Sequence, residues 1–192
     1  MKIGKYKLKL VEAGTMMLDG GAIFGVVPKN LWKKDFASDE NNRIKLTARC
    51  LLATSDNKKI LVDTGIGSGW DEKFCKIYQT GDDILQKSLI NLGVTADEIT
   101  DVFLTHLHFD HCGGSVIWDN GKFQPAFTNA KYHIQKKQFE WALNPCERDK
   151  ASYFPDRFMP IFDSGLLNLT DSEFQFDDEI SIQVVNGHTF AM

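Results

Sequence analysis

The sequence has no apolar run close to the roughly 20 residues that a membrane-spanning helix requires, and its start lacks the apolar core of a signal peptide. It contains no repeat and no low-complexity tract. Basic residues are not in excess, since 22 Lys and Arg face 26 Asp and Glu for a net charge of −4. We therefore expect a single cytoplasmic domain over residues 1–192 that binds neither nucleic acid nor a membrane surface.

Cysteines are few and widely separated. Cys50, Cys75, Cys112 and Cys146 form no Cys-x-x-Cys pair, which argues against a thiolate zinc site or a redox motif. Cys112 adjoins a histidine-rich segment, so it could be a soft neighbour of a metal or a nucleophile. Because free cysteine usually packs as a small hydrophobe, we interpret it as a buried filler in a reduced, cytoplasmic chain.

Strand and helix patterns alternate along the chain. Apolar runs and alternation predict strands over residues 5–11, 44–54, 59–62, 101–105, 131–134 and 180–184. Helical spacing predicts helices over 82–92, with Asp82 at the start and Gly93 at the end, and over 135–143. Interleaved elements with polar residues at strand ends predict a layered α/β enzyme whose site lies along the rim of a sheet.

The segment 105–111 contains three of the five histidines within six positions. Alternate residues of an extended segment point the same way, so His106 and His108 can reach one metal ion together. Asp110 and His111 follow where the chain bends and can turn toward a second ion. Imidazole and carboxylate ligands suit zinc, and also iron or manganese. The segment therefore predicts a site for one or two metal ions.

The pattern His106-x-His108-x-Asp110-His111 after a short apolar strand resembles the signature of the metallo-β-lactamase superfamily. Residues 61–65 resemble the Asp-Thr-Gly strand end of that family, and 187–189 its Gly-His-Thr segment. The resemblance implies a four-layer αββα sandwich of the α/β (α+β) class. It also implies that His106, His108 and His188 hold the first metal, and that Asp110 and His111 hold the second.

The same resemblance implies roles behind and beyond the ligands. Asp63 would orient an imidazole by a hydrogen bond, as carboxylates behind metal ligands do. Asp110 would also be catalytic, accepting or relaying a proton. The family's bridging aspartate and last histidine come later than His188, where only four residues remain. We therefore expect the N-terminal portion of the fold, incomplete at the C-terminus, and a homo-oligomer or a missing C-terminal segment as its partner.

Residues 19–32 resemble the early segment of lactonase-like members of the superfamily, a branch that includes quorum-quenching enzymes. This likeness implies hydrolysis of a carboxylic ester or lactone, such as an N-acyl homoserine lactone, by metal-activated water. Phe24 and Phe109 could line a pocket for the substrate. Two alternatives remain open. One is another hydrolase of this fold, acting on a thioester, β-lactam or phosphotriester, and the other is an inactive metal-binding fragment.

Overall fold

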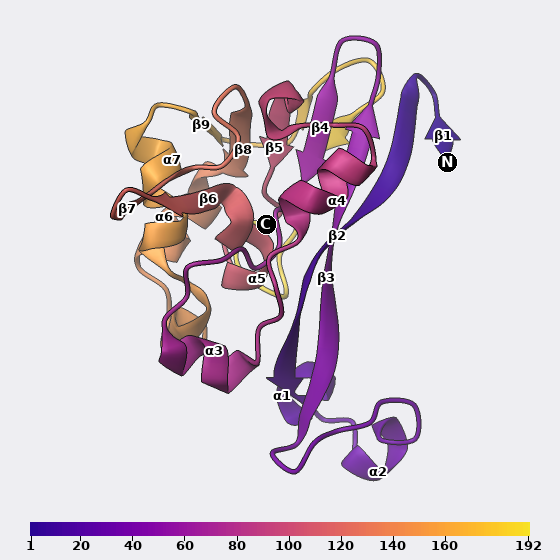
Figure 1. Ribbon diagram of the computed structural model, residues 1–192, viewed down its shortest axis with the longest axis vertical. Coiled ribbons are helices and arrows are strands. Elements are labelled where there is room, and N and C mark those ends of the chain that lie inside the picture. Colours follow the sequence, from indigo (N-terminus) through magenta and orange to yellow (C-terminus); the bar gives the residue numbers. More distant parts are fainter.

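The computed structural model describes residues 1–192 and is organised around a seven-stranded mixed sheet. Figure 1 shows how the helices are arranged around this sheet. In spatial order its strands are β1 (Lys2–Ile3), β2 (Tyr6–Asp19), β3 (Arg43–Thr54), β4 (Lys59–Val62), β5 (Asp101–Phe103), β8 (Lys131–Gln135) and β9 (Leu167–Thr170). The first four strands pair antiparallel, and β4, β5, β8 and β9 pair parallel. A mixed sheet interleaved with helices confirms the predicted α/β class.

Helices and two small hairpins occupy the connections. The helices are α1 (Gly20–Phe24), α2 (Lys29–Trp32), α3 (Glu72–Tyr78), α4 (Leu85–Asn91), α5 (Phe109–Cys112), α6 (Lys136–Leu143) and α7 (Met159–Asp163), with 3₁₀ turns at Ala96–Glu98, Gly113–Ser115, Lys150–Ser152 and Pro155–Arg157. The hairpins are β6 (Val116–Asp119) with β7 (Lys122–Pro125), and β10 (Phe174–Gln175) with β11 (Ser181–Ile182). None of the helices combines the length and apolar character needed to cross a bilayer.

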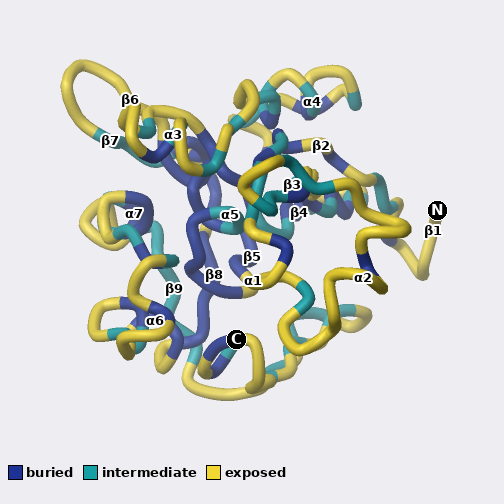
Figure 2. The backbone as a smooth tube through the Cα atoms, turned by 90° about the horizontal axis from the view of Figure 1, so that it is seen from below, coloured by how far each residue is buried: buried dark blue, intermediate teal, exposed yellow.

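The two faces of the sheet have different neighbours, because side chains alternate along each strand. Leu61 and Val102 point to the main core, which they share with Leu89 of α4 and Phe139 of α6. The buried parts of the backbone converge on this core in Figure 2. The helices α4 and α6 therefore cover one face of the sheet, and other elements pack against the opposite face.

The opposite face is only partly covered. Ile60 and Phe103 pack there against the β10–β11 hairpin, through partly buried Phe174 and Ile182. The same residues also line a largely apolar groove of about 800 Å³ over the sheet. This face therefore carries apolar surface that the hairpin does not cover.

Several predicted elements agree with the structure, and others differ for clear reasons. The strand over 59–62 is confirmed without change as β4. The strand expected over 5–11 continues to Asp19, because β3 stays paired with it beyond an irregularity between Glu12 and Thr15. The helix expected from Asp82 begins at Leu85, whose N–H donates to the Asp83 carboxylate across 3.2 Å. The strand expected over 180–184 shrinks to two residues, Ser181–Ile182.

Strands β2 and β3 extend well beyond the body of the molecule as an arm that carries α1 and α2 at its far end (Figure 1). At this end the Phe24 ring stacks on Trp32, with centroids 4.8 Å apart, and lies 5.1 Å from the ring of Phe36. Phe24 therefore belongs to an aromatic cluster of the arm.

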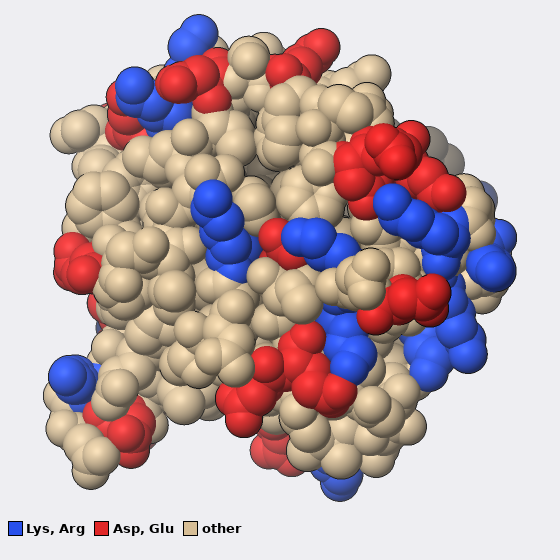
Figure 3. Space-filling view, turned by 90° about the horizontal axis from the view of Figure 1, so that it is seen from above, with Lys and Arg blue, Asp and Glu red and all other residues tan.

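Charges of both signs are interspersed on the end of the molecule shown in Figure 3. Local ion pairs account for several surface charges. Lys58 lies 2.8 Å from the Asp101 carboxylate, and Lys5 lies 3.1 Å from Asp177. Neither sign forms a continuous patch on that face.

Candidate metal centre

The histidine segment begins where β5 ends at the rim of the sheet. After Phe103 the chain runs through Thr105 to His108, which precedes the short helix α5 in an extended conformation. The rings of His106 and His108 lie 4.5 Å apart. His188 comes from 80 residues further along the chain, and its ring lies 5.0 Å from His106 and 4.9 Å from His108. The fold thus assembles three imidazoles that the sequence separates.

The nitrogen atoms of these rings fit a metal ion. One ligand atom from each of His106, His108 and His188 falls within a mutual separation of 4.8 Å. Nε2 of His188 lies 3.1 Å from Nδ1 of His108, and the buried Nε2 of His106 has no hydrogen-bond partner. Buried polar atoms nearly always have partners, so an orphaned ring nitrogen facing two others is a strong indication of a ligand. Three imidazoles are a donor set that suits zinc.

Asp63 connects two of the imidazoles from behind. Its carboxylate accepts hydrogen bonds from the Thr105 backbone N–H at 2.8 Å and from the Thr105 hydroxyl at 3.0 Å. It also lies 2.8 Å from Nδ1 of His111. Since the Thr105 hydroxyl donates to Asp63, it accepts from Nδ1 of His106 at 3.0 Å. These bonds place protons on both Nδ1 atoms and leave the Nε2 lone pairs of His106 and His111 free for a cation.

The backbone at Asp63 has a left-handed conformation, with φ of 59°. Aspartate tolerates this region better than most residues, because its short side chain bonds locally. Nearby, the Thr64 N–H donates to the His111 carbonyl across 2.7 Å. The end of β4 and the start of α5 are therefore tied together directly behind the histidines.

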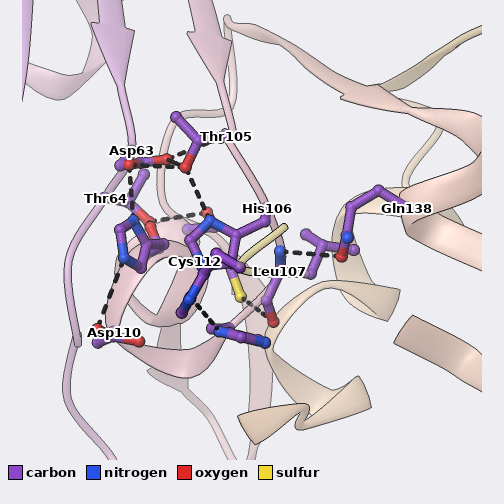
Figure 4. A network of polar contacts seen from close by, with 12 residues as sticks. Asp63, Thr64, Thr105, His106, Leu107, Asp110, Cys112 and Gln138 are labelled. Carbon is purple, nitrogen blue, oxygen red and sulfur yellow. Dashed lines mark hydrogen bonds and ion pairs between the residues drawn. The ribbon is translucent and has the colours of Figure 1, made fainter. Parts of the chain in front are cut away.

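Asp110 (Figure 4) and the neighbouring His111 form a second group of candidate metal ligands. The Asp110 carboxylate lies 3.6 Å from Nε2 of His111, and the His111 ring is 4.0 Å from that of His106. This pair therefore sits beside the three-histidine cluster. Within this chain it supplies two ligand groups, one fewer than the neighbouring cluster.

Burial sets the protonation of the histidines. Desolvation, followed by repulsion from His111, lowers the pKa of His106 to about 2. Desolvation and the neighbouring His188 lower the pKa of His108 to about 4. Burial acts the same way on His111, but the hydrogen bond to Asp63 and the negative charges of Asp63 and Asp110 together outweigh it and raise the pKa of that ring. His106 and His108 are therefore neutral near pH 7, as metal ligands must be.

Glycines allow the chain to pass close to itself below the site. A Cβ on Gly67 would lie 2.4 Å from the Gly113 carbonyl oxygen, and one on Gly114 would lie 2.3 Å from that of Thr64. Cys112 is fully buried here, and its thiol contacts the Leu107 carbonyl at 3.4 Å. Desolvation raises the pKa of Cys112, which agrees with the interpretation of a buried filler.

The two phenylalanines considered for the substrate differ in position. Phe109 begins α5 between His108 and Asp110, and its buried ring packs edge-on against Phe74, with centroids 5.1 Å apart. Phe24 packs instead within the aromatic cluster of the arm.

Three residues near the histidines were not predicted from the sequence. Gln138, Tyr153 and Thr189 are buried polar residues that contact the histidine-bearing segments. Gln138 and Tyr153 belong to no sequence motif that would indicate a role at the site. For Thr189 the only signal in the sequence is its position after Gly187 and His188.

Comparison with known proteins places the chain in a family. The family model of the metallo-beta-lactamase superfamily matches residues 45–188, and the chain belongs to this superfamily. Its fold superimposes on the crystal structure of a "probable metal-dependent hydrolase" from Staphylococcus aureus with a TM-score of 0.88 and 31% identity, over 100% of this chain and 68% of that one.

Two lactonases are among the similar proteins. The N-acyl homoserine lactonase AiiA of Bacillus thuringiensis subsp. kurstaki is 28% identical over 160 residues, which cover 78% of this chain and 56% of AiiA. The dizinc quorum-quenching lactonase AidC, solved with a product, is 25% identical with a TM-score of 0.77, over 100% of this chain and 67% of AidC. The chain thus spans little more than half the length of AiiA.

Proposed function

We propose that this chain provides the metal centre of a metal-dependent hydrolase that opens N-acyl homoserine lactones or similar lactones. The observation that carries the proposal is the orphaned Nε2 of buried His106, in a cluster where His106, His108 and His188 each place a ligand atom within 4.8 Å of the others. The lactonases AiiA and AidC, which share the fold, support the choice of substrate class.

His106, His108 and His188 would hold the first metal ion, which we propose to be zinc, as in the dizinc enzyme AidC. Asp110 and His111 would contribute to a second ion. Iron or manganese could occupy the same ligands. When bound, the ions would supply a water that ionises near neutral pH and a Lewis acid for the lactone carbonyl.

The remaining residues act through position and charge. Asp63 holds His111, and through Thr105 also His106, in the tautomers whose Nε2 atoms face the site. Asp110 lies at the edge of the site with its carboxylate directed toward His111. There it can accept a proton during attack on the carbonyl and return it to the leaving alkoxide. We propose that Phe109, which lies between His108 and Asp110 in the sequence, forms a wall of the substrate pocket. The position of Phe24 at the far end of the arm does not support the same role for that residue.

Metal removal and restoration test the proposal. Chelated protein should lose lactone opening, and added zinc should restore it, whereas a His106→Ala variant should stay inactive in zinc. A panel with a thioester, a β-lactam and a phosphotriester distinguishes other hydrolases of the superfamily. Full lactonase activity after chelation would contradict the mechanism, and zinc binding without turnover of any substrate would favour an inactive metal-binding fragment.

We also propose that the apolar groove over β4 and β5 is covered in the active species, by a second copy or by additional polypeptide. Its apolar lining around Ile60 and Phe103 supports this, because exposed apolar patches of this kind usually contact a partner. Light scattering tests the proposal, and a stable monomer without any companion polypeptide would contradict it.

A cytoplasmic location is a further proposal. All four cysteines are free, and Cys50 and Cys112 are buried as thiols, which suits a reducing compartment. Fractionation of cells that express the protein would test the assignment, and recovery outside the cytoplasm would contradict it.

A further inference from the structure

Gln138 of α6 contacts both segments that carry the histidine cluster. Its side-chain oxygen accepts from the backbone N–H of Leu107, between His106 and His108, at 3.4 Å (Figure 4). Its amide nitrogen donates to the carbonyl of Phe190, two residues beyond His188. The side chain is completely buried. One amide group therefore bridges two segments that lie about 80 residues apart in the sequence.

Two hydroxyl groups continue this contact. The Tyr153 hydroxyl lies 3.2 Å from the Gln138 oxygen and 2.6 Å from the hydroxyl of Thr189. The Thr189 hydroxyl also reaches the Asp149 carboxylate at 3.4 Å. The Tyr153 ring packs against the His108 ring, with centroids 4.8 Å apart. These polar residues therefore contact the His108 ring directly and hold Thr189, the residue next to His188.

The segment around His188 has few other attachments. The last strand, β11, ends at Ile182, and the residues after it form no helix or strand. Backbone bonds join only Val185 to Met192 and Gly187 to Thr189. His188 itself is exposed, whereas Thr189 is buried. The Ala191 N–H also donates to Asn186 Oδ1 at 2.8 Å, and the Phe190 ring lies 5.5 Å from that of Trp141. The buried Thr189 side chain is thus one of few groups that attach this segment to the body of the molecule.

We propose that Gln138, Tyr153 and Thr189 form a positioning clamp that sets His188 at its distance from His106 and His108. The inference rests on the proposed metal site. The three residues act through their neighbours and do not themselves bind metal or substrate. Groups behind metal ligands commonly change metal affinity about 10–100-fold when removed, because they fix ligand orientation.

A control variant is needed to separate a positioning role from a general contribution to stability. Tyr132 is also fully buried, and its hydroxyl bonds the Ser115 carbonyl at 3.1 Å and the Phe127 N–H at 3.0 Å without touching either histidine segment. Tyr132→Phe removes a buried hydroxyl from the same core. It therefore separates a general loss of stability from a loss of ligand placement.

The experiment compares the 192-residue chain with Gln138→Glu, Thr189→Val, Thr189→Ser and the control Tyr132→Phe. Gln138→Glu keeps the oxygen acceptors but loses the amide that donates to Phe190. Zinc affinity is measured by competition with a chelator, and the Co²⁺ absorption spectrum reports the ligand geometry. Hydrogen exchange of residues 185–192 is measured in the metal-free protein, which needs no assumption about metal binding.

We expect Gln138→Glu and Thr189→Val to weaken zinc binding about 10–100-fold, to alter the Co²⁺ spectrum and to speed exchange in 185–192. Thr189→Ser and Tyr132→Phe should stay close to the wild type in all three. Wild-type affinity and exchange in Thr189→Val and Gln138→Glu would overturn the clamp, as would equal weakening in Tyr132→Phe. A wild-type chain that binds no zinc would instead overturn the proposed function, and the exchange data would still decide the clamp.

Discussion

The Asp63 carboxylate lies 2.8 Å from Nδ1 of His111, across 48 residues of sequence. This contact joins the end of β4 to α5 and raises the pKa of an imidazole that burial alone would lower. It explains how one residue outside the histidine segment controls which nitrogen of His111 faces the site.

Asp63→Asn should lower the pKa of His111. Asparagine tolerates the left-handed backbone at this position and can still accept from Nδ1, so the fold should persist. It removes the negative charge that favours the protonated ring. Titration of the His111 ring by NMR in metal-free protein should show the downward shift. Asp56→Asn, in the turn between β3 and β4, is the control, and an unchanged pKa in Asp63→Asn would contradict this role.

The metal-free protein should lose stability as pH falls from 7 to 5. Burial lowers the pKa of His106 to about 2, whereas an unfolded histidine titrates near about 6.5. Below about pH 6.5 the unfolded chain binds a proton at this histidine, whereas the folded chain does not. The free energy of unfolding therefore decreases as the pH is lowered toward the pKa of the folded state. Urea unfolding of His106→Gln should show a smaller decrease over this range than the wild type. Equal decreases in the two proteins would be evidence against a neutral, buried His106.

Arg157→Met should destabilise the protein by about 2–4 kcal/mol. The buried guanidinium of Arg157 lies 3.6 Å from the Trp70 ring centroid and 4.1 Å from that of Phe123, and it donates to the carbonyls of Ser68 and Gly69. The change leaves both carbonyls without their donor. Thermal and urea unfolding measure the loss.

Arg49→Met is the matched control, because Arg49 forms an exposed ion pair with Glu12 at 2.8 Å. Such pairs contribute about 0–1 kcal/mol. If both methionine variants unfold at the same urea concentration, Arg157 does not hold the loop at 68–69.

Gly113→Ala should both destabilise the protein and move His111. A Cβ at this position would meet the Ile66 carbonyl oxygen at 2.0 Å, so the backbone below the site must shift. Such overpacking costs about 1–3 kcal/mol. Gly165→Ala is the control. It introduces backbone strain at a φ of 76°, but no atom lies within 4 Å of the added Cβ. The NMR signals of the His111 ring should change in Gly113→Ala alone, and unchanged signals would show that the close packing does not position α5.

The sequence predicts the parts of the fold that depend on local pattern. Strand β4 is set by a short apolar run before Asp63, and its bounds agree with the prediction. His133 lies on the strand predicted over 131–134, where its ring contacts Asp101 at 3.0 Å and Asn168 at 3.1 Å and so has a structural role. The length of β2 could not be predicted, because it depends on pairing with β3 beyond Glu12.

The candidate site divides in the same way. His106, His108, Asp110 and His111 form one compact motif, and the sequence alone predicts that they lie together. His188 was found only through resemblance to a family, since no local pattern brings it to the cluster. Gln138 could not be found at all, because its contacts with Leu107 and Phe190 exist only once α6 has packed.

Anomalous scattering from crystals soaked in zinc gives the most direct test of the metal centre. The account predicts a zinc peak about 2.0–2.1 Å from Nε2 of His106, Nδ1 of His108 and Nε2 of His188. No peak among these nitrogens in zinc-soaked crystals of folded protein would contradict it.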